Sequence, residues 1–454
     1  MRDLVAMGVL CTGLLAVGPA WAGHHDGPAT VRIRNVKATP RDAKTATISF
    51  DLTWRNSWRH EVSHDAVWMF FKAKPEGSTE WRHVRLVADH VLNPAGYGQE
   101  GGTKLDFIVP DDEGGPVGMF VRRAEYGQGT VTATGITVVV EWKQNVQPST
   151  VAGAVSQVPL NPEPRTLPPE LRAFGLEMVY VPEGPFLLGL NATDANAFYQ
   201  YTDGLNSETP YKVASAGPIP TGRQKGKLWA GGKEGYPEDG GKIPATFPNG
   251  YAAFYCMKGQ IKFGQYAGFL DTISPELVAK HKKGKLNPSG TPPRFTPAVE
   301  GEATDYLYDQ APWPQGAAWG AWAGLRPMTE LEFEKVSRGP LDPGVETGYE
   351  LKYSSYWGMQ DCNGWKASCE HTVTVGNAKG RGFKGTHGNG TLVLPADWPQ
   401  DDGVGSGMRG GYEYRNPACR ISAAQMISGG NAIVDGSPYD VWRGVRTAPA
   451  EAGK

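Results

Sequence analysis

Apolar residues alternate with polar ones along much of the chain between Thr30 and Trp142. The clearest run is TISFDLTW, whose apolar positions are Ile48, Phe50, Leu52 and Trp54. Three further β-rich runs, AVWMFFKAK, TKLDFIVP and GITVVVEW, are separated by glycine, proline and aspartate turns. Because side chains of a strand point alternately to two faces, this pattern predicts an all-β sandwich domain over residues 23–145.

The pattern ends in QNVQPSTVAGAVSQVPLNPEPRTLPPE, a proline-rich, aperiodic stretch that predicts a linker over residues 146–170. The remaining residues, 171–454, predict a second domain with few long periodic segments. Two helices are clear within it. In KFGQYAGFLDTI the apolar residues form one stripe, and in MTELEFEKVSRGP a capping box joins Thr329 to Glu332 before Gly339 and Pro340 end the helix.

The N-terminal segment predicts that the protein is exported. The N-terminus, MRDLVAMGVLCTGLLAVGPAWAG, has a thin positive start, an apolar core too short to span a membrane, and a small-x-small cleavage site. We therefore expect a signal peptide over residues 1–22, cleavage after Ala22, and a periplasmic or secreted protein. No later stretch is long and apolar enough to span a membrane. The formal charge of −2 gives no indication of a nucleic-acid partner.

Five blocks of the second domain resemble, in order, the formylglycine-generating enzyme or sulfatase-modifying-factor family. They are EMVYVPEGPFLLGL, FYCMKGQIKFGQYAGFL, LRPMTELEFEKVSRG, GMRGGYEY with CRISA, and VWRGVR, spread over residues 177–446. The resemblance implies the family's α+β, C-type-lectin-like fold with little regular secondary structure, and a bacterial protein. It does not extend to the predicted sandwich.

The family's oxidases convert a substrate cysteine to formylglycine with copper and oxygen, and they hold the metal between two cysteine thiolates. Soft sulfur ligands suit Cu(I). In this chain the corresponding positions, residues 413–418, contain no cysteine, and Cys419 stands alone. The resemblance therefore favours a domain without the oxidase site, in which Cys419 is a core or disulfide residue.

The stretch NGWKASCE resembles the family's calcium loop. By that resemblance, the side chains of Asn363 and Glu370 and the backbone carbonyls of Lys366 and Ser368 would bind the ion, because Ca²⁺ prefers hard oxygen ligands. The alternative is that Glu370 forms an ion pair and Asn363 caps a turn. Both interpretations stay open at this point.

Four cysteines remain after the signal peptide: Cys256, Cys362, Cys369 and Cys419. In an oxidising compartment an even number favours disulfides. A bridge from Cys362 to Cys369 would close a short loop, and Cys256 with Cys419 would make a second bridge. Sequence does not choose among the three pairings, although the resemblance implies that Cys256 lies in the core.

Two further stretches carry candidate chemistry. HEVSH, from His60 to His64, matches the zinc pattern H-E-x-x-H, but its β-rich neighbours disfavour the helix that this chemistry needs, so we expect solvated histidines in a loop. The glycine-rich segment from His371 to Leu392 predicts an irregular surface that could line a ligand groove. Three tryptophans could line the same groove, with at least one in the core: Trp313, Trp319 and Trp322.

The sequence thus predicts an exported, non-oxidising member of the family that binds a protein, peptide or glycan ligand, with calcium as a candidate cofactor. The alternative is an oxidase of a peptidyl cysteine or of another substrate, which would require copper and would use Cys419. A zinc hydrolase at HEVSH is the third hypothesis.

Overall fold

The computed structural model describes most of the chain. Its described residues are 31–42, 44–75, 78–87, 97–141, 170–189, 197–202, 209–230, 241–282, 286–289, 294–297, 311–342, 355–360, 369–376, 378–409 and 440–453. The predicted signal peptide lies outside them, as does all but the last residue of the predicted linker. The described chain is a mixed structure rich in antiparallel sheet, which agrees with an α+β class at that level.

The period-two runs form strands, as predicted. A four-stranded sheet has the order β1-β2-β8-β5, with bounds Val31–Pro40, Thr45–Arg59, Gly127–Glu141 and Gly101–Gly102. In β2 buried and partly exposed residues alternate along the strand, because one face meets a core and the other meets solvent. That core contains Phe50 and Trp54 of β2, Val138 of β8, and Met69 and Phe71 of the facing sheet.

The facing sheet has eight strands and joins distant parts of the chain. Its path is β17-β21-β14-β9-β3-β7-β6, and β4 pairs with β3 at the side. The bounds in that order are Arg326–Pro327, Gly444–Thr447, Phe254–Met257, Glu170–Val181, Asp65–Lys74, Met119–Arg123 and Leu105–Ile108, with β4 at Arg82–Val84.

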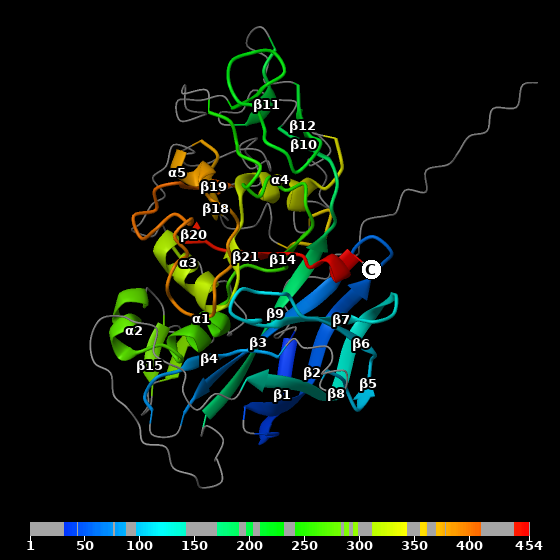
Figure 1. The fold of residues 1–454 in the computed structure, drawn as a ribbon, viewed down its shortest axis with the longest axis vertical. Coiled ribbons are helices and arrows are strands. Elements are labelled where there is room, and N and C mark those ends of the chain that lie inside the picture. The colour runs from blue at the N-terminus through cyan, green and yellow to red at the C-terminus, as the bar shows by residue number, and fades with distance from the viewer. Residues whose placement is uncertain are drawn as a thin grey trace, which may run out of the picture.

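This sheet bears on the predicted boundary at residues 146–170. Strand β9 begins at Glu170, the last residue of that stretch, and pairs antiparallel with β3 over ten positions, from Lys74 opposite Glu170 to Asp65 opposite Val179. On its other side β9 pairs with β14. The stretches before and after the predicted linker therefore share one sheet (Figure 1).

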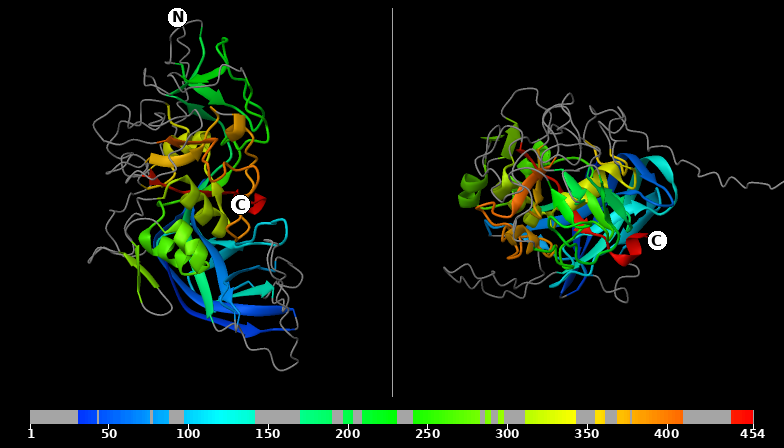
Figure 2. Two further views of the ribbon diagram at one scale, coloured as in Figure 1. Left: turned by 90° about the vertical axis from the view of Figure 1, so that its left-hand side faces the viewer. Right: turned by 90° about the horizontal axis from the view of Figure 1, so that it is seen from above.

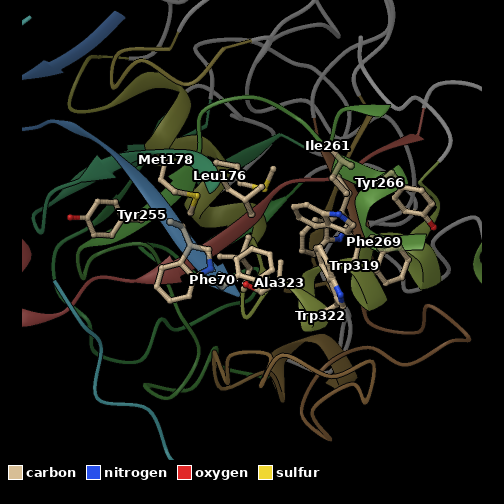
Figure 3. Packing of buried hydrophobic residues seen from close by; sticks show 14 of the residues in the cluster. Phe70, Leu176, Met178, Tyr255, Ile261, Tyr266, Phe269, Trp319, Trp322 and Ala323 are labelled. Atoms are coloured by element: carbon tan, nitrogen blue, oxygen red, sulfur yellow. Dashed lines mark hydrogen bonds between the residues drawn. The ribbon is translucent and has the colours of Figure 1, made fainter. Parts of the chain in front are cut away.

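Helices cover one face of this sheet. The predicted apolar stripe lies on α1, Phe263–Leu270, and its four members Phe263, Tyr266, Ala267 and Leu270 are all buried. Helix α3, Trp313–Trp322, packs beside it, and α2, Pro275–His281, follows α1. Trp322 of α3 packs against Phe70 of the sheet and Phe269 of α1, with ring centroids 5.1 and 5.4 Å away, in a cluster that also contains Leu176 (Figure 3). The core thus contains residues from before and after the predicted linker.

Helix α3 approaches the C-terminal part of the chain closely. Gly316 and Gly320 face the ring of Trp442, and a Cβ on either glycine would come within 2.3 Å of an indole atom. No real Cβ contact is that short, so both positions require glycine unless the indole moves. Glycine lowers helix propensity, which close packing offsets here.

Helix α4, Glu330–Arg338, has the predicted capping box. The Thr329 side chain accepts a hydrogen bond from the Glu332 backbone N–H at 3.1 Å, and the Glu332 carboxylate accepts one from the Thr329 N–H at 3.0 Å. The helix ends at Gly339, whose φ of 64° lies in the region that glycine tolerates best.

Short strands and helices complete the described chain. The two-stranded sheets are β10 with β12, β11 with β13 and β15 with β16, with bounds Phe186–Leu188, Tyr211–Val213, Phe198–Gln200, Leu228–Ala230, Leu286–Ser289 and Arg294–Pro297. A three-stranded sheet, β19-β18-β20, consists of Ser406–Arg409, Cys369–Val373 and Asp440–Val441. Helix α5 is Ala378–Arg381 and the 3-10 helix η4 is Ala450–Gly453.

The molecule is elongated, with its larger sheets and its small strands at opposite ends. Strands β1, β2 and β8 lie at the lower end of Figure 1 and of the left view of Figure 2, and β10, β11 and β12 lie at the upper end. The helices and the three-stranded sheet lie between them. Among the described residues, none of the helices has the length and apolar character that crossing a membrane requires.

Candidate functional site

Glu370 is the one predicted calcium ligand whose side chain the structure describes. It lies in β18, the central strand of the three-stranded sheet, and is 1% exposed. Its Oε2 accepts hydrogen bonds from Arg443 Nε at 2.9 Å and from Gln260 Nε2 at 3.2 Å. Asn363, Lys366 and Ser368 lie outside the described residues. The ion pair that the sequence left open is therefore present, and the calcium site stays a prediction.

Arg443 connects this carboxylate to the end of β14. Its Nη1 donates to the Lys258 carbonyl at 2.9 Å, and its Nη2 donates to the Gln360 carbonyl. The guanidinium is fully buried. A buried charge needs both a counterion and hydrogen bonds, and Arg443 has both.

A second buried ionic cluster lies beside this one, and sequence analysis missed it. Lys258 Nζ lies 2.6 Å from Glu177 Oε1 and 3.4 Å from Asp65 Oδ2. Burial raises the pKa of Asp65 to about 6, although Lys258 acts in the opposite direction. The two carboxylates hold the pKa of Lys258 above its ordinary value, against the effect of burial. No sequence signal indicated this cluster, because Asp65 is far from its partners along the chain.

The described thiol is not placed for catalysis. Cys256 lies in β14, is fully buried as the resemblance implied, and is a free cysteine with its Sγ 3.8 Å from Met359 Sδ. Burial raises the pKa of this thiol well above its ordinary value, so the reactive thiolate is suppressed. Cys362 and Cys419 lie outside the described residues, as does the side chain of Cys369.

Helix α4 carries three glutamates, and each one is buried against an arginine. The pairs are Glu330 with Arg409 at 2.7 Å, Glu332 with Arg326 at 2.7 Å and Glu334 with Arg338 at 3.1 Å. Arg326 reaches both carboxylate oxygens of Glu332, which is the fork geometry that guanidinium favours. Carboxylates bound in this way hold the fold together and are poor general acids or bases.

The arginines of the resembling blocks that the structure describes are all buried and paired. Each is at most 1% exposed and forms an ion pair with a carboxylate: Arg326, Arg338, Arg409, Arg443 and Arg446. The partner of Arg446 is Asp112, which comes from the stretch before the predicted linker. These arginines of the blocks therefore serve here as buried counterions.

The HEVSH stretch connects β2 to β3, so it is the strand connection that we predicted and not a zinc-binding helix. His60 is exposed, but the expectation of a solvated histidine is wrong for His64, which is 3% exposed. Its Nε2 lies 2.8 Å from the Tyr255 hydroxyl, and its ring stacks on Tyr180. Burial, together with the nearby Arg122, lowers the pKa of His64 to about 2. The His60 imidazole is thus exposed and the His64 imidazole is buried, so the two are not arranged on one face as a zinc site of this type requires.

A small polar pocket, also missed from sequence, lies beside His64. Its wall includes Arg122, which donates to Asp106 Oδ2 at 3.2 Å and to the Ala452 carbonyl of η4 at 2.6 Å. The exposed side chains of Val62 and Tyr126 form part of its rim. Throughout the described ranges, no three His, Cys, Asp or Glu side chains come close enough together to hold a metal ion.

The tryptophans of α3 do not line a groove. Trp313, Trp319 and Trp322 are at most 2% exposed and belong to the core. The glycine-rich segment that starts at His371 is also less superficial than expected, because its first three residues form part of β18 and are fully buried. From residue 382 to residue 392 the segment is irregular, as predicted.

The comparisons with known proteins do not add a family. No protein-family model, curated protein or solved structure matches this chain. The resemblance therefore rests on the five blocks alone.

Proposed function

We propose that the chain is an exported bacterial protein of the sulfatase-modifying-factor type, which binds a protein, peptide or glycan ligand without oxidising it. The observation that carries this proposal is the pairing of the block arginines with carboxylates. Similarity in such residues reflects a shared scaffold, and a scaffold hosts more than one function.

The described chemistry supports a binding role. The three glutamates of α4 are neutralised by arginines, and the described thiol is buried with a raised pKa. An oxidase of this type needs two sulfur ligands close together for Cu(I). The sequence between Gly410 and Ala418 offers no cysteine as a neighbour for Cys419.

Catalysis is tested directly with Cu(I), oxygen and a peptide that carries the sulfatase-type cysteine motif, followed by mass spectrometry of the peptide. We expect the peptide to keep its mass. Conversion to formylglycine that disappears in Cys419→Ser would establish the oxidase instead. Cys256→Ser is the matched control, because that thiol is buried away from solvent and its loss should not change any rate.

A further inference from the structure

Strand β1 forms one edge of the four-stranded sheet and carries a row of exposed cations. Arg32, Arg34 and Lys37 are all exposed, and Arg55 extends the row on the neighbouring β2. Within the described residues, none of these four side chains forms an ion pair or a hydrogen bond. Two exposed lysines elsewhere do have acidic partners: Lys104 pairs with Glu125, and Lys280 pairs with Asp401.

Among the described residues, Asp51 is the carboxylate in register with this row, and it is already engaged. Asp51 lies across from Arg34 in the β1–β2 register, but its Oδ2 accepts from Asn35 at 2.5 Å and its Oδ1 accepts from the Gly135 N–H at 2.9 Å. These two hydrogen bonds lower the pKa of Asp51, so it stays ionised. The exposed Glu100 lies over Gly135, beside Asp51. The two carboxylates reduce the positive potential of the row, but its four cations outnumber them.

Hydroxyl groups continue the face beyond the cations. In register, Arg32 lies opposite Thr53, which lies opposite Thr132 on β8, and Lys37 lies opposite Ser49. Neighbouring strands are about 4.8 Å apart, and alternate residues of a strand are about 6.8 Å apart. The outward side chains thus place cations along the β1 edge and hydroxyls on β2 and β8, with a β-bulge between Arg34 and Lys37.

We propose that this face, made of Arg32, Arg34, Lys37 and Arg55 with the hydroxyls of β2 and β8, binds a linear acidic polysaccharide. The cations match carboxylate or sulfate groups repeated along a chain, and the hydroxyls match its sugar hydroxyls. A second copy of the protein fits poorly, because the two cationic edges would repel each other. Duplex DNA also fits poorly, because its charges lie about 1.7 Å apart along the helix axis, far more densely than four cations about 6.8 Å or more apart.

The face lies at the opposite end of the molecule from β10 to β13 and outside the stretch that resembles the sulfatase-modifying factors (Figure 1). The inference is therefore independent of the proposed function. Edge cations also serve a simpler purpose, since they prevent unwanted strand pairing. The experiment separates the two roles.

The test measures binding of the full chain to polygalacturonate, with dextran as the neutral control, at several salt concentrations. We expect saturable binding to polygalacturonate that weakens as salt rises, because exposed charges are screened, and no binding to dextran. The triple variant Arg32→Ser, Arg34→Ser, Lys37→Ser should lose at least tenfold in affinity. The double variant Lys104→Ser, Lys280→Ser, which removes exposed cations elsewhere, should bind like the parent.

Equal urea midpoints for the triple variant and the parent show that folding is intact. The proposal is overturned if the parent does not bind polygalacturonate, if the triple variant binds equally well, or if duplex DNA binds as tightly. If the parent shows no binding and the triple variant aggregates, the proposal is also overturned. The cations would then serve only to prevent unwanted pairing of the β1 edge with another strand.

Discussion

Replacing Trp68 tests whether the stretches before and after the proline-rich segment unfold as one body. Trp68 lies in β3, is fully buried, and donates from Nε1 to the Ala323 carbonyl at the end of α3 at 2.8 Å. The Arg446 guanidinium lies 4.4 Å from the centre of its ring. One side chain thus contacts residues from both stretches.

The expected loss can be worked out from these contacts. Truncating a buried tryptophan to alanine costs about 3–5 kcal/mol, through lost burial and the cavity that remains. The hydrogen bond and the cation–π contact each contribute about 1 kcal/mol. We therefore expect Trp68→Ala to lower the free energy of unfolding by about 5–7 kcal/mol. Trp68→Phe should lower it by about 1–2 kcal/mol, since a ring remains. Val393→Ala, at an exposed position, should stay within about 0.5 kcal/mol of the parent.

The assay is hydrogen exchange by mass spectrometry across a urea series, which follows peptides from β2 and from α3 separately. If the shared sheet is one cooperative unit, Trp68→Ala shifts both midpoints by the same amount. A β2 midpoint that falls while the α3 midpoint stays unchanged would refute this reasoning and would restore two independent domains, as the sequence pattern alone suggests.

Four other outcomes follow from the site. If NGWKASCE binds calcium, calcium raises the melting temperature and Asn363→Ala abolishes the rise; equal melting temperatures with calcium and with chelator would leave only the ion pair of Glu370. Purified protein should carry no stoichiometric zinc, and His60→Ala should fold normally; one zinc per chain, lost in the variant, would reverse this. Cys256 should resist thiol reagents until the protein unfolds, and rapid labelling of the native thiol would contradict its burial. The raised pKa of Asp65 means that the folded state binds its proton more tightly than the unfolded state, so its contribution to stability is present below about pH 4 and is lost as pH rises through about 6. Between pH 4 and pH 7 the urea midpoint of the parent should therefore fall relative to that of Asp65→Asn. A constant difference between the two midpoints over this pH range would exclude the effect.

Local patterns predicted the elements whose causes are local. The stripe of α1 and the capping box of α4 are settled within one or two helical turns, so a single sequence reveals them. The same holds for the alternating strand β2. The pairing of β3 with β9 depends on residues about one hundred positions apart, and no local pattern records such a register.

One local signal did bear on this pairing. In β3, nine consecutive residues from Asp65 to Ala73 are buried, with no alternation. A continuous apolar run such as AVWMFF is typical of a central strand covered on both faces, whereas the outer strand of a sandwich alternates. The run therefore indicated that something would cover its second face. It did not indicate that helices α1 and α3, from beyond the linker, would do so.

The candidate site was less predictable from sequence, because most of its buried charges are neutralised by residues far away along the chain. Helix α4 is an amphipathic, charged segment by sequence, yet all nine of its residues are buried. Its glutamates are tolerated there because each one forms an ion pair with an arginine. Arg326 precedes the helix, Arg338 is its last residue, and Arg409 lies in a strand about seventy residues later. Each partner looks like an ordinary surface residue until the fold brings the pair together.

This arrangement changes what the five resembling blocks mean. A buried arginine that has lost its carboxylate leaves an uncompensated charge, which costs about 3–5 kcal/mol, so such pairs are retained whether or not any chemistry takes place nearby. The paired arginines of the blocks, from Arg326 to Arg446, meet this condition. A catalytic cysteine pair has no such structural role and can be absent without loss of the fold. In the described part of this chain, folding alone therefore accounts for the block arginines, and the relation to the sulfatase-modifying factors stays a proposal.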